Sequence, residues 1–317
     1  MFDGRSPTLK SLDRAGRRVR TLAVITAVST YLLVVLGSTV RVSNSGMGCS
    51  SWPLCNGRLG PIDHLHPLLE QSHRYLAAIV TIAIVALVAL TWRGGTRVRH
   101  VRPYSLASLG VVVVQIVLGA ITVLTDNAPA TVAAHLVVGL LFLAVVTLTA
   151  VASFIDPATP WHRFRGDRLA WASVGGLFVV LLSGSLVVDG GAATACRSWP
   201  VCLSSPSSTR LVVIQYVHRS LVLLAVGLVV AFLAGLWRDR RTSHRLVVAA
   251  LTLIVVQIVV GAFDAVLGAP AALADAHLAL ASALWALMVA LLSHSALEPI
   301  PLEFYTPRSS RISRVAR

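Results

Sequence analysis

The chain has 317 residues, of which 56% are hydrophobic and only 13% are charged, and its mean hydropathy is +0.79. This leaves too few polar side chains to cover a water-facing surface, which excludes the pair of soluble domains that the length alone would suggest. The 27 Lys and Arg against 13 Asp and Glu give a net charge of +14, a value that in a soluble protein would suggest nucleic-acid binding. The composition instead predicts an integral membrane protein.

Eight long stretches contain no Asp, Glu, Lys or Arg and are long enough to cross a bilayer as a helix. They are 21–40, 75–92, 103–125, 127–155, 169–188, 220–237, 246–263 and 276–297. The strands of a transmembrane barrel would be about half as long and would alternate in polarity, which these stretches do not. We therefore predict an all-α polytopic membrane protein with eight transmembrane helices.

The basic residues are concentrated in every second segment between the predicted helices. Of the 27 Lys and Arg, 21 lie in the N-terminal tail, in 93–102, 163–168 and 238–245, and after residue 298. By the positive-inside rule both termini are then cytoplasmic, and the net charge reflects topology rather than a nucleic-acid partner. The first uncharged stretch is too long for the apolar part of a cleaved signal peptide, so we expect none. The sequence thus predicts a multi-pass protein of the cell membrane.

The second half of the chain repeats the first. Residues 37–55 resemble 184–202 with an offset of 147, His73 matches His218 with an offset of 145, and 113–120 match 255–262 with an offset of 142. An even number of crossings returns each half to the same side, so we expect parallel repeats, built as two four-helix bundles related by a pseudo-twofold axis. The expected boundaries are a cytoplasmic tail at 1–20, a first bundle at 21–155, a linker at 156–168, a second bundle at 169–297 and a cytoplasmic tail at 298–317.

Four of the ten histidines lie near the outer ends of predicted helices that run inward: His73, His135, His218 and His277. Helices that run the same way bring these side chains to a similar depth, and ionisable groups in membrane spans usually mark function. The alternative is that each is an amphipathic residue of the headgroup region. Zinc needs three or four ligands, whereas two imidazoles on facing helices suit haem iron. We expect one haem between His73 and His135 and another between His218 and His277, both toward the extracytoplasmic side.

The residues beside the first histidine of each pair differ between the halves. Arg74 and Arg219 are candidates to pair with haem propionates, or else with lipid phosphate. Glu70 precedes His73 by three residues, where the second half has Gln215, and this spacing puts both side chains on one helix face. Glu70 is thus a candidate for proton transfer or charge stabilisation, unless it is simply a carboxylate favoured by the helix dipole. We expect the reacting haem in the first half and a permanent haem in the second.

All four cysteines belong to two equally spaced pairs, Cys49 with Cys55 and Cys196 with Cys202, each enclosing Trp-Pro. The predicted topology puts both loops outside the cytoplasm, where disulfides persist. Structural bridges that close the loops are favoured, and a redox-active pair is the alternative. No C-x-x-C-H is present, which excludes covalent haem attachment of the c type.

Other polar residues of the spans have less distinctive patterns. Asp264 and Asp275 lie at the outer ends of the last two spans, and without a partner visible in the sequence they are as compatible with solvated loop positions. Two Gln/Gly pairs one helical turn apart could let helices approach closely or could offer a hydrogen bond inside the bundle, and we assign them to packing: Gln115 with Gly119, and Gln257 with Gly261.

Together these motifs resemble the bacterial haem A synthase family. The resemblance covers about residues 20 to 295 and rests on GSTVRVSNSGMGCSSWPLC, EQSHR and QIVLGAITV in the first half and on SWPVC, QYVHR, QIVVGA and DAHL in the second. It implies the conversion of haem O to haem A, in which the C8 methyl group of the porphyrin is oxidised to a formyl group through successive hydroxylations. The product serves haem–copper terminal oxidases.

The resemblance also implies a role for each key residue. His73 and His135 correspond to the pair associated with the substrate haem, and His218 and His277 to the pair that holds haem B. Glu70 corresponds to the catalytic glutamate of the first external loop. The two cysteine pairs match as well.

Two other classes of protein stay open on the sequence. A non-enzymatic dihaem electron-transfer protein would need two similar haems, so the difference between Glu70 and Gln215 counts against this class. A transporter fits parallel repeats, but the spans lack Gly/Pro interruptions and midplane charges. The expected partners are the lipid bilayer, haem O, the farnesyltransferase that makes haem O, and an electron acceptor that the sequence does not identify.

Overall fold

The computed structural model describes residues 7–60, 63–155, 168–203, 208–238 and 243–297. These residues form eight α-helices and one short 3-10 helix, η1. The elements are α1 (Pro7–Val42), α2 (Leu65–Arg93), η1 (Thr96–Val101), α3 (Arg102–Leu124), α4 (Pro129–Ala152), α5 (Arg168–Asp189), α6 (Thr209–Arg238), α7 (His244–Val266) and α8 (Ala271–Leu297). The linker expected at 156–168 and the tail expected at 298–317 lie outside the described residues, apart from Arg168 at the start of α5.

All eight α-helices of the described ranges are long and apolar enough to cross a membrane. Each corresponds to one predicted stretch, so the prediction of an all-α multi-pass membrane protein is confirmed. Lipid offers no hydrogen-bond partners to the backbone, and even segments rich in Val and Ile therefore become helical. Helices α2 and α6 begin at Leu65 and Thr209, well before the uncharged stretches at 75–92 and 220–237. A charged residue interrupts an uncharged stretch without interrupting a helix, so the histidines lie inside these helices rather than at their ends.

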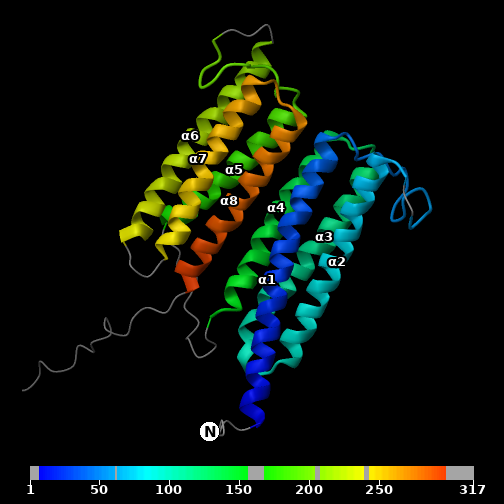
Figure 1. Ribbon diagram of the computed structural model, residues 1–317, viewed down its shortest axis with the longest axis vertical. Helices are drawn as coiled ribbons and strands as arrows, with labels where there is room; N and C mark the ends of the chain where they lie inside the picture. Colours follow the sequence, from blue (N-terminus) through cyan, green and yellow to red (C-terminus); the bar gives the residue numbers. More distant parts are fainter. Residues whose placement is uncertain (1–6, 61–62, 156–167, 204–207, 239–242, 298–317) are drawn as a thin grey trace, which may run out of the picture.

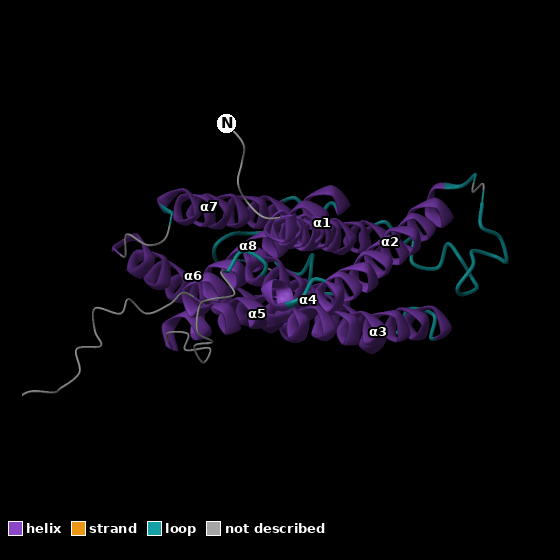
Figure 2. Ribbon diagram, turned by 90° about the horizontal axis from the view of Figure 1, so that it is seen from below, coloured by secondary structure: helices purple, strands orange, loops and turns teal. Residues whose placement is uncertain are grey.

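The helices form two groups that follow the chain order (Figures 1 and 2). In the first group α1 packs on α2, α2 on α3, α3 on α4, and α4 back on α1. The second group repeats this ring with α5, α6, α7 and α8, and the two groups meet where α8 contacts α1 and α4, and where α4 contacts α5. This is the arrangement expected for two four-helix bundles side by side, while the pseudo-twofold axis stays a prediction.

The odd-numbered helices all end in the same local structure. In each, a backbone N–H bonds the carbonyl five residues earlier, as in a Schellman motif, at distances of 2.7 to 2.8 Å. The N–H donors are Ser45, Asn127, Ala192 and Ala269. Residues at or just before these donors have positive φ, for example Asn44 at 53° and Gly191 at 70°. The repeated motif stops each helix at the end of the bundle that carries the α1–α2 and α5–α6 loops.

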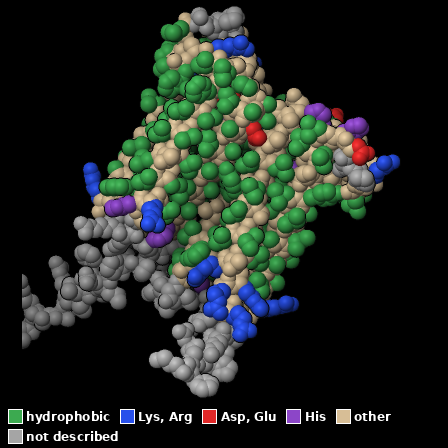
Figure 3. Space-filling model, viewed as in Figure 1, with side chains coloured by type: hydrophobic (Ala, Val, Ile, Leu, Met, Phe, Trp, Pro, Cys, Tyr) green, Lys and Arg blue, Asp and Glu red, His purple; other side chains and the backbone are tan. Residues whose placement is uncertain are grey.

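The packed interior lies between the helices, and the outer surface is apolar too. Ile84 on α2 is fully buried, whereas Ile82 on the same helix is 69% exposed. One buried cluster joins α5, α6, α7 and α8 to α4, where the indole N–H of Trp285 donates to the Leu140 carbonyl at 3.0 Å. Hydrophobic side chains cover the middle of the face seen in Figure 3, and Lys and Arg gather near the start of α1. This distribution is the one that lipid contact requires.

Polar contacts join the two bundles near their loop-bearing ends. Thr39 of α1 donates to Asp275 of α8 at 2.7 Å, and Arg41 of α1 forms an ion pair with Asp189 of α5. Asp275 therefore lies in a helix with a partner from the other bundle. Asp264 lies in α7, and one of its carboxylate oxygens is buried without a hydrogen-bond partner. Neither aspartate occupies the solvated loop position that the sequence left open.

The helix faces predict which truncations destabilise the protein. Ile84→Ala removes a fully buried side chain between helices and is expected to lower the free energy of unfolding by about 2–5 kcal/mol. Ile82→Ala, on the outer face of the same helix, is the matched control and should change it little. Thermal unfolding in detergent, followed by circular dichroism, measures both, and equal losses would contradict this assignment of faces.

Candidate functional site

The four candidate histidines lie in the even-numbered helices, each within the first third of its helix. A positive charge on His135 of α4 would be felt at His73 of α2, and one on His277 of α8 at His218 of α6. The fold therefore places both members of each expected pair in one bundle, while their joint binding of a haem stays a prediction. Both pairs lie toward the end that carries the disulfide loops.

Each imidazole lies edge-on against a glycine of the preceding helix. A Cβ added to any of these glycines would meet the Cε1 atom of the histidine first, at 2.5 to 3.3 Å. The contacts are Gly37 with His73, Gly119 with His135, Gly184 with His218, and Gly261 with His277. Because a methyl group at these positions would press on the ring, glycine is what lets the imidazole fit between the two helices.

The ring nitrogens have few partners within the protein. The Nδ1 atoms of His73, His135 and His277 are buried without a hydrogen bond. The Nδ1 of His218 instead lies 2.7 Å from the Ser183 hydroxyl, and at the corresponding position the first half has Leu36, with the offset of 147. Buried imidazoles left with unpaired polar atoms are unusual in a protein interior, and such groups often mark a ligand site.

Two glutamines approach the second histidine of each pair. The Nε2 atom of Gln115 lies 3.2 Å from Nε2 of His135, and Nε2 of Gln257 lies 3.2 Å from Nε2 of His277. The assignment of these residues to helix packing was therefore incomplete, because both amides contact the candidate ligands directly.

The histidine pairs fit haem better than a bare metal ion. Within the described part of the chain, no group of three or more His, Cys, Asp or Glu side chains is placed to hold a metal ion. A zinc site would need at least three such ligands, whereas a porphyrin fills four positions of its own iron and leaves two for imidazoles. The paired, partly orphaned imidazoles in each bundle thus have the donor set that haem requires.

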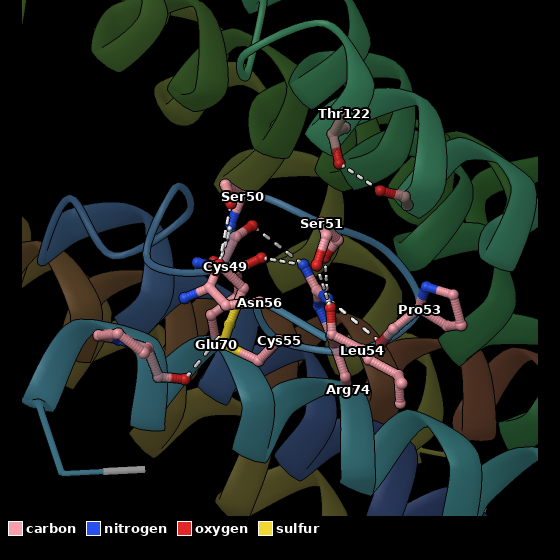
Figure 4. Close-up of polar contacts among 12 residues, drawn as sticks. Cys49, Ser50, Ser51, Pro53, Leu54, Cys55, Asn56, Glu70, Arg74 and Thr122 are labelled. Carbon is pink, nitrogen blue, oxygen red and sulfur yellow. Dashed lines mark hydrogen bonds and ion pairs between the residues drawn. A yellow bond between two sulfur atoms is a disulfide. The ribbon is translucent and has the colours of Figure 1, made fainter. Parts of the chain in front are cut away.

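The first disulfide loop folds around Arg74 (Figure 4). A disulfide joins Cys49 to Cys55, and the Arg74 guanidinium donates to the Ser51 carbonyl at 2.7 Å and to further carbonyls of the loop. The Nη2 atom of Arg74 lies 2.5 Å from Oε1 of Glu70. The other carboxylate oxygen, Oε2, accepts a hydrogen bond from the backbone N–H of Cys49 at 2.8 Å. Glu70 is 4% exposed. The carboxylate thus ties the loop to α2, one turn before His73.

The second loop repeats this structure without a carboxylate. A disulfide joins Cys196 to Cys202, and Arg219 donates to loop carbonyls, including that of Ser198 at 2.9 Å. In place of the glutamate, the amide of Gln215 donates to a carbonyl at 2.8 Å. Both expected disulfides are therefore present. The guanidinium contacts show that the arginines organise the loops, a role the sequence analysis missed, while pairing with propionates stays a prediction.

Comparison with known proteins identifies the family. The model of the cytochrome oxidase assembly protein family matches residues 20–289. The chain belongs to this family.

Relatives of this chain carry an enzyme name. The chain is 28% identical over 262 residues to the heme A synthase of Geobacillus thermodenitrificans, which covers 78% of this chain and 81% of the relative. It is 29% identical over 257 residues to the heme A synthase of Staphylococcus carnosus, with 78% and 83% covered, and 28% identical over 257 residues to that of Bacillus mycoides, with 77% and 83% covered.

The sequence analysis did not identify the glycines at 37 and 184 as neighbours of the histidines. The signal was present in the repeat, where GST at 37–39 aligns with GSL at 184–186. The pattern identified the two segments as equivalent, but only the packing of α1 on α2 and of α5 on α6 shows that each glycine faces a histidine.

The glycine contacts predict a graded response to added methyl groups. Gly261→Ala would place a Cβ 2.5 Å from Cε1 of His277, and Gly119→Ala would place one 3.2 Å from Cε1 of His135. Overpacking of this kind is expected to lower the free energy of unfolding by about 1–3 kcal/mol, more for Gly261. Gly110→Ala is the control on α3, because nothing lies within 4 Å of its Cβ position and alanine favours a helix. Thermal unfolding of the three variants would contradict the prediction if the control were the least stable.

Proposed function

We propose that this protein is a haem A synthase, which oxidises the C8 methyl group of haem O to the formyl group of haem A. The observation that carries the proposal is the presence of two imidazole pairs in the membrane bundles of a chain whose relatives are named heme A synthase. Those relatives match over more than three quarters of the chain, and the family model matches residues 20–289, from α1 into α8. An oxidoreductase acting on a haem that dissolves in the bilayer suits a multi-pass membrane protein.

His73 and His135 are proposed to hold haem O and its product in the first bundle, and His218 and His277 to hold haem B in the second. The haem irons would supply the redox chemistry when bound. The two sites differ in their protein surroundings, which supports different tasks. Ser183 fixes the ring of His218 by a hydrogen bond at 2.7 Å, while the Nδ1 atom of His73 has no such partner. A ring held by the protein suits a permanent ligand.

Glu70 is proposed as the catalytic residue of the first site. It lies on α2 three residues before His73, and its two oxygens contact Arg74 and the Cys49 backbone. A carboxylate held in this way can accept or return a proton, or stabilise positive charge that develops nearby. The neutral Gln215 can do neither at the second site, so the chemistry is assigned to the first.

The disulfide loops are proposed to lie on the extracytoplasmic side, with both termini in the cytoplasm. Three features support this orientation. Basic residues lie at the start of α1, Lys and Arg are concentrated in every second segment between the spans, and the two disulfides lie at the opposite end. Haem O would then enter from the bilayer, either free or from the farnesyltransferase that makes it. The electrons removed from the methyl group would pass to an acceptor outside this chain.

Haem analysis tests the proposed function. The full-length protein is co-produced with a haem O farnesyltransferase and purified in detergent, and its haems are extracted and identified by chromatography and mass. We expect haem B together with haem O, hydroxylated intermediates or haem A. Two haem B per chain, with no haem A formed in the cells, would instead support a dihaem electron-transfer protein.

Substitution of Glu70 separates its charge from its contacts with the loop. Glu70→Gln keeps an oxygen that can accept the Cys49 N–H, and it should retain both haems while lowering turnover by about 10²- to 10⁴-fold, the range of a lost acid–base group. Glu70→Ala should also retain both haems and stop turnover. Gln215→Met in the second half is the matched control. Haem content and the rate of haem A formation are measured together, and full activity of Glu70→Gln would exclude the assigned role.

A further inference from the structure

The amide of Gln115 makes two contacts with one histidine. Its Nε2 atom lies 3.2 Å from Nε2 of His135 and 3.0 Å from the carbonyl oxygen of the same residue. A carbonyl only accepts hydrogen bonds, so the atom facing it must be the NH₂ group rather than the amide oxygen. The same NH₂ group therefore donates to His135 Nε2, and that nitrogen must be the unprotonated one.

The second bundle has the glutamine but not the second contact. Nε2 of Gln257 lies 3.2 Å from Nε2 of His277, and in the described residues no further acceptor bonds this amide. The two bundles also differ at one position of the helix that carries the histidine, and this difference accounts for the missing contact. Gly139 lies one turn after His135, and a Cβ there would be 3.1 Å from Nε2 of Gln115. With the offset of 142 the second bundle has Ala281 at this position.

The hydrogen bond and iron ligation need the same electron pair. An imidazole whose Nδ1 carries the proton has one lone pair, on Nε2, and it can be given either to an amide N–H or to a metal. Gln115 thus competes with the iron for His135. Its bond to the backbone carbonyl keeps the amide in place whichever partner the ring takes, and Gln257 lacks this anchor.

We propose that Gln115 is a positioning residue that makes His135 the displaceable ligand of the first haem site, while His277 stays a permanent ligand of the second. The inference rests on the proposed haem sites. Gln115 holds the ring when His135 leaves the iron, and it thereby keeps one face of the haem accessible to a small molecule. Gly139 has no side chain, and it therefore leaves room for the Gln115 amide to come this close to His135.

Carbon monoxide binding tests this proposal directly, because carbon monoxide binds a ferrous haem with two protein ligands only after one of them has left the iron. The full-length protein is co-produced with a haem O farnesyltransferase and purified with both sites loaded, reduced with dithionite and titrated with carbon monoxide, and the bound fraction is read from the absorption spectrum. The wild-type protein is expected to bind carbon monoxide at one haem. Gln115→Met, which keeps the length but removes the donor, should lower the affinity for carbon monoxide about two- to tenfold, the value of one net hydrogen bond.

Two further variants make the outcome specific. Gly139→Ala should shift the affinity in the same direction as Gln115→Met, because it pushes the amide away from His135. Gln257→Met is the matched control and should leave carbon monoxide binding as in the wild type. Total haem per chain is measured for each variant, and Gly139→Ala provides the test if Gln115→Met does not fold.

Each remaining result has a distinct meaning. The inference is overturned if the haem-loaded wild-type protein binds no carbon monoxide, if Gln115→Met or Gly139→Ala retains haem with an unchanged affinity, or if Gln257→Met has the same effect as Gln115→Met. If the wild-type protein binds no haem at all, the proposed function itself fails.

Discussion

The contact between a glycine and an imidazole, made once in every helix pair, is the constraint on which the rest of the structure depends. A histidine ring is a large polar group to place between two apolar membrane helices, and it fits here because the facing residue has no side chain. The close approach fixes how α1 lies on α2, α3 on α4, α5 on α6, and α7 on α8. The rings of each bundle then lie at a similar depth, which is the condition for two of them to bind one flat cofactor.

The outer loops depend on this same framework. Arg74 and Arg219 each follow a histidine by one residue, so a helix that places the ring in the bundle also places a guanidinium under the neighbouring loop. Each guanidinium donates hydrogen bonds to carbonyls of a loop that a disulfide closes. The loops are thereby held over the ends of the bundles that contain the histidines.

The two halves share this framework and differ in the groups placed on it. The first half has Glu70 where the second has Gln215, and Gly139 where the second has Ala281. The second half has Ser183 to hold a ring, where the first has an apolar residue. All these differences agree with the proposal that the first site exchanges protons and releases a ligand. The proposed function accordingly assigns the chemistry to the first site and the permanent cofactor to the second.

The sequence by itself determined the number of spans, the repeat, the cysteine pairs and the candidate histidines. Hydropathy and charge suffice for these, because lipid permits only helices here and because a repeat copies its residues at constant offsets. Only the tertiary structure decided what those residues touch. The glycines at 37 and 184, the carbonyls around Arg74, the partner of Asp275 and the two bonds of Gln115 all depend on how one helix packs against another. These contacts join residues far apart in the chain, and the distances between such residues are not encoded in any local pattern of the sequence.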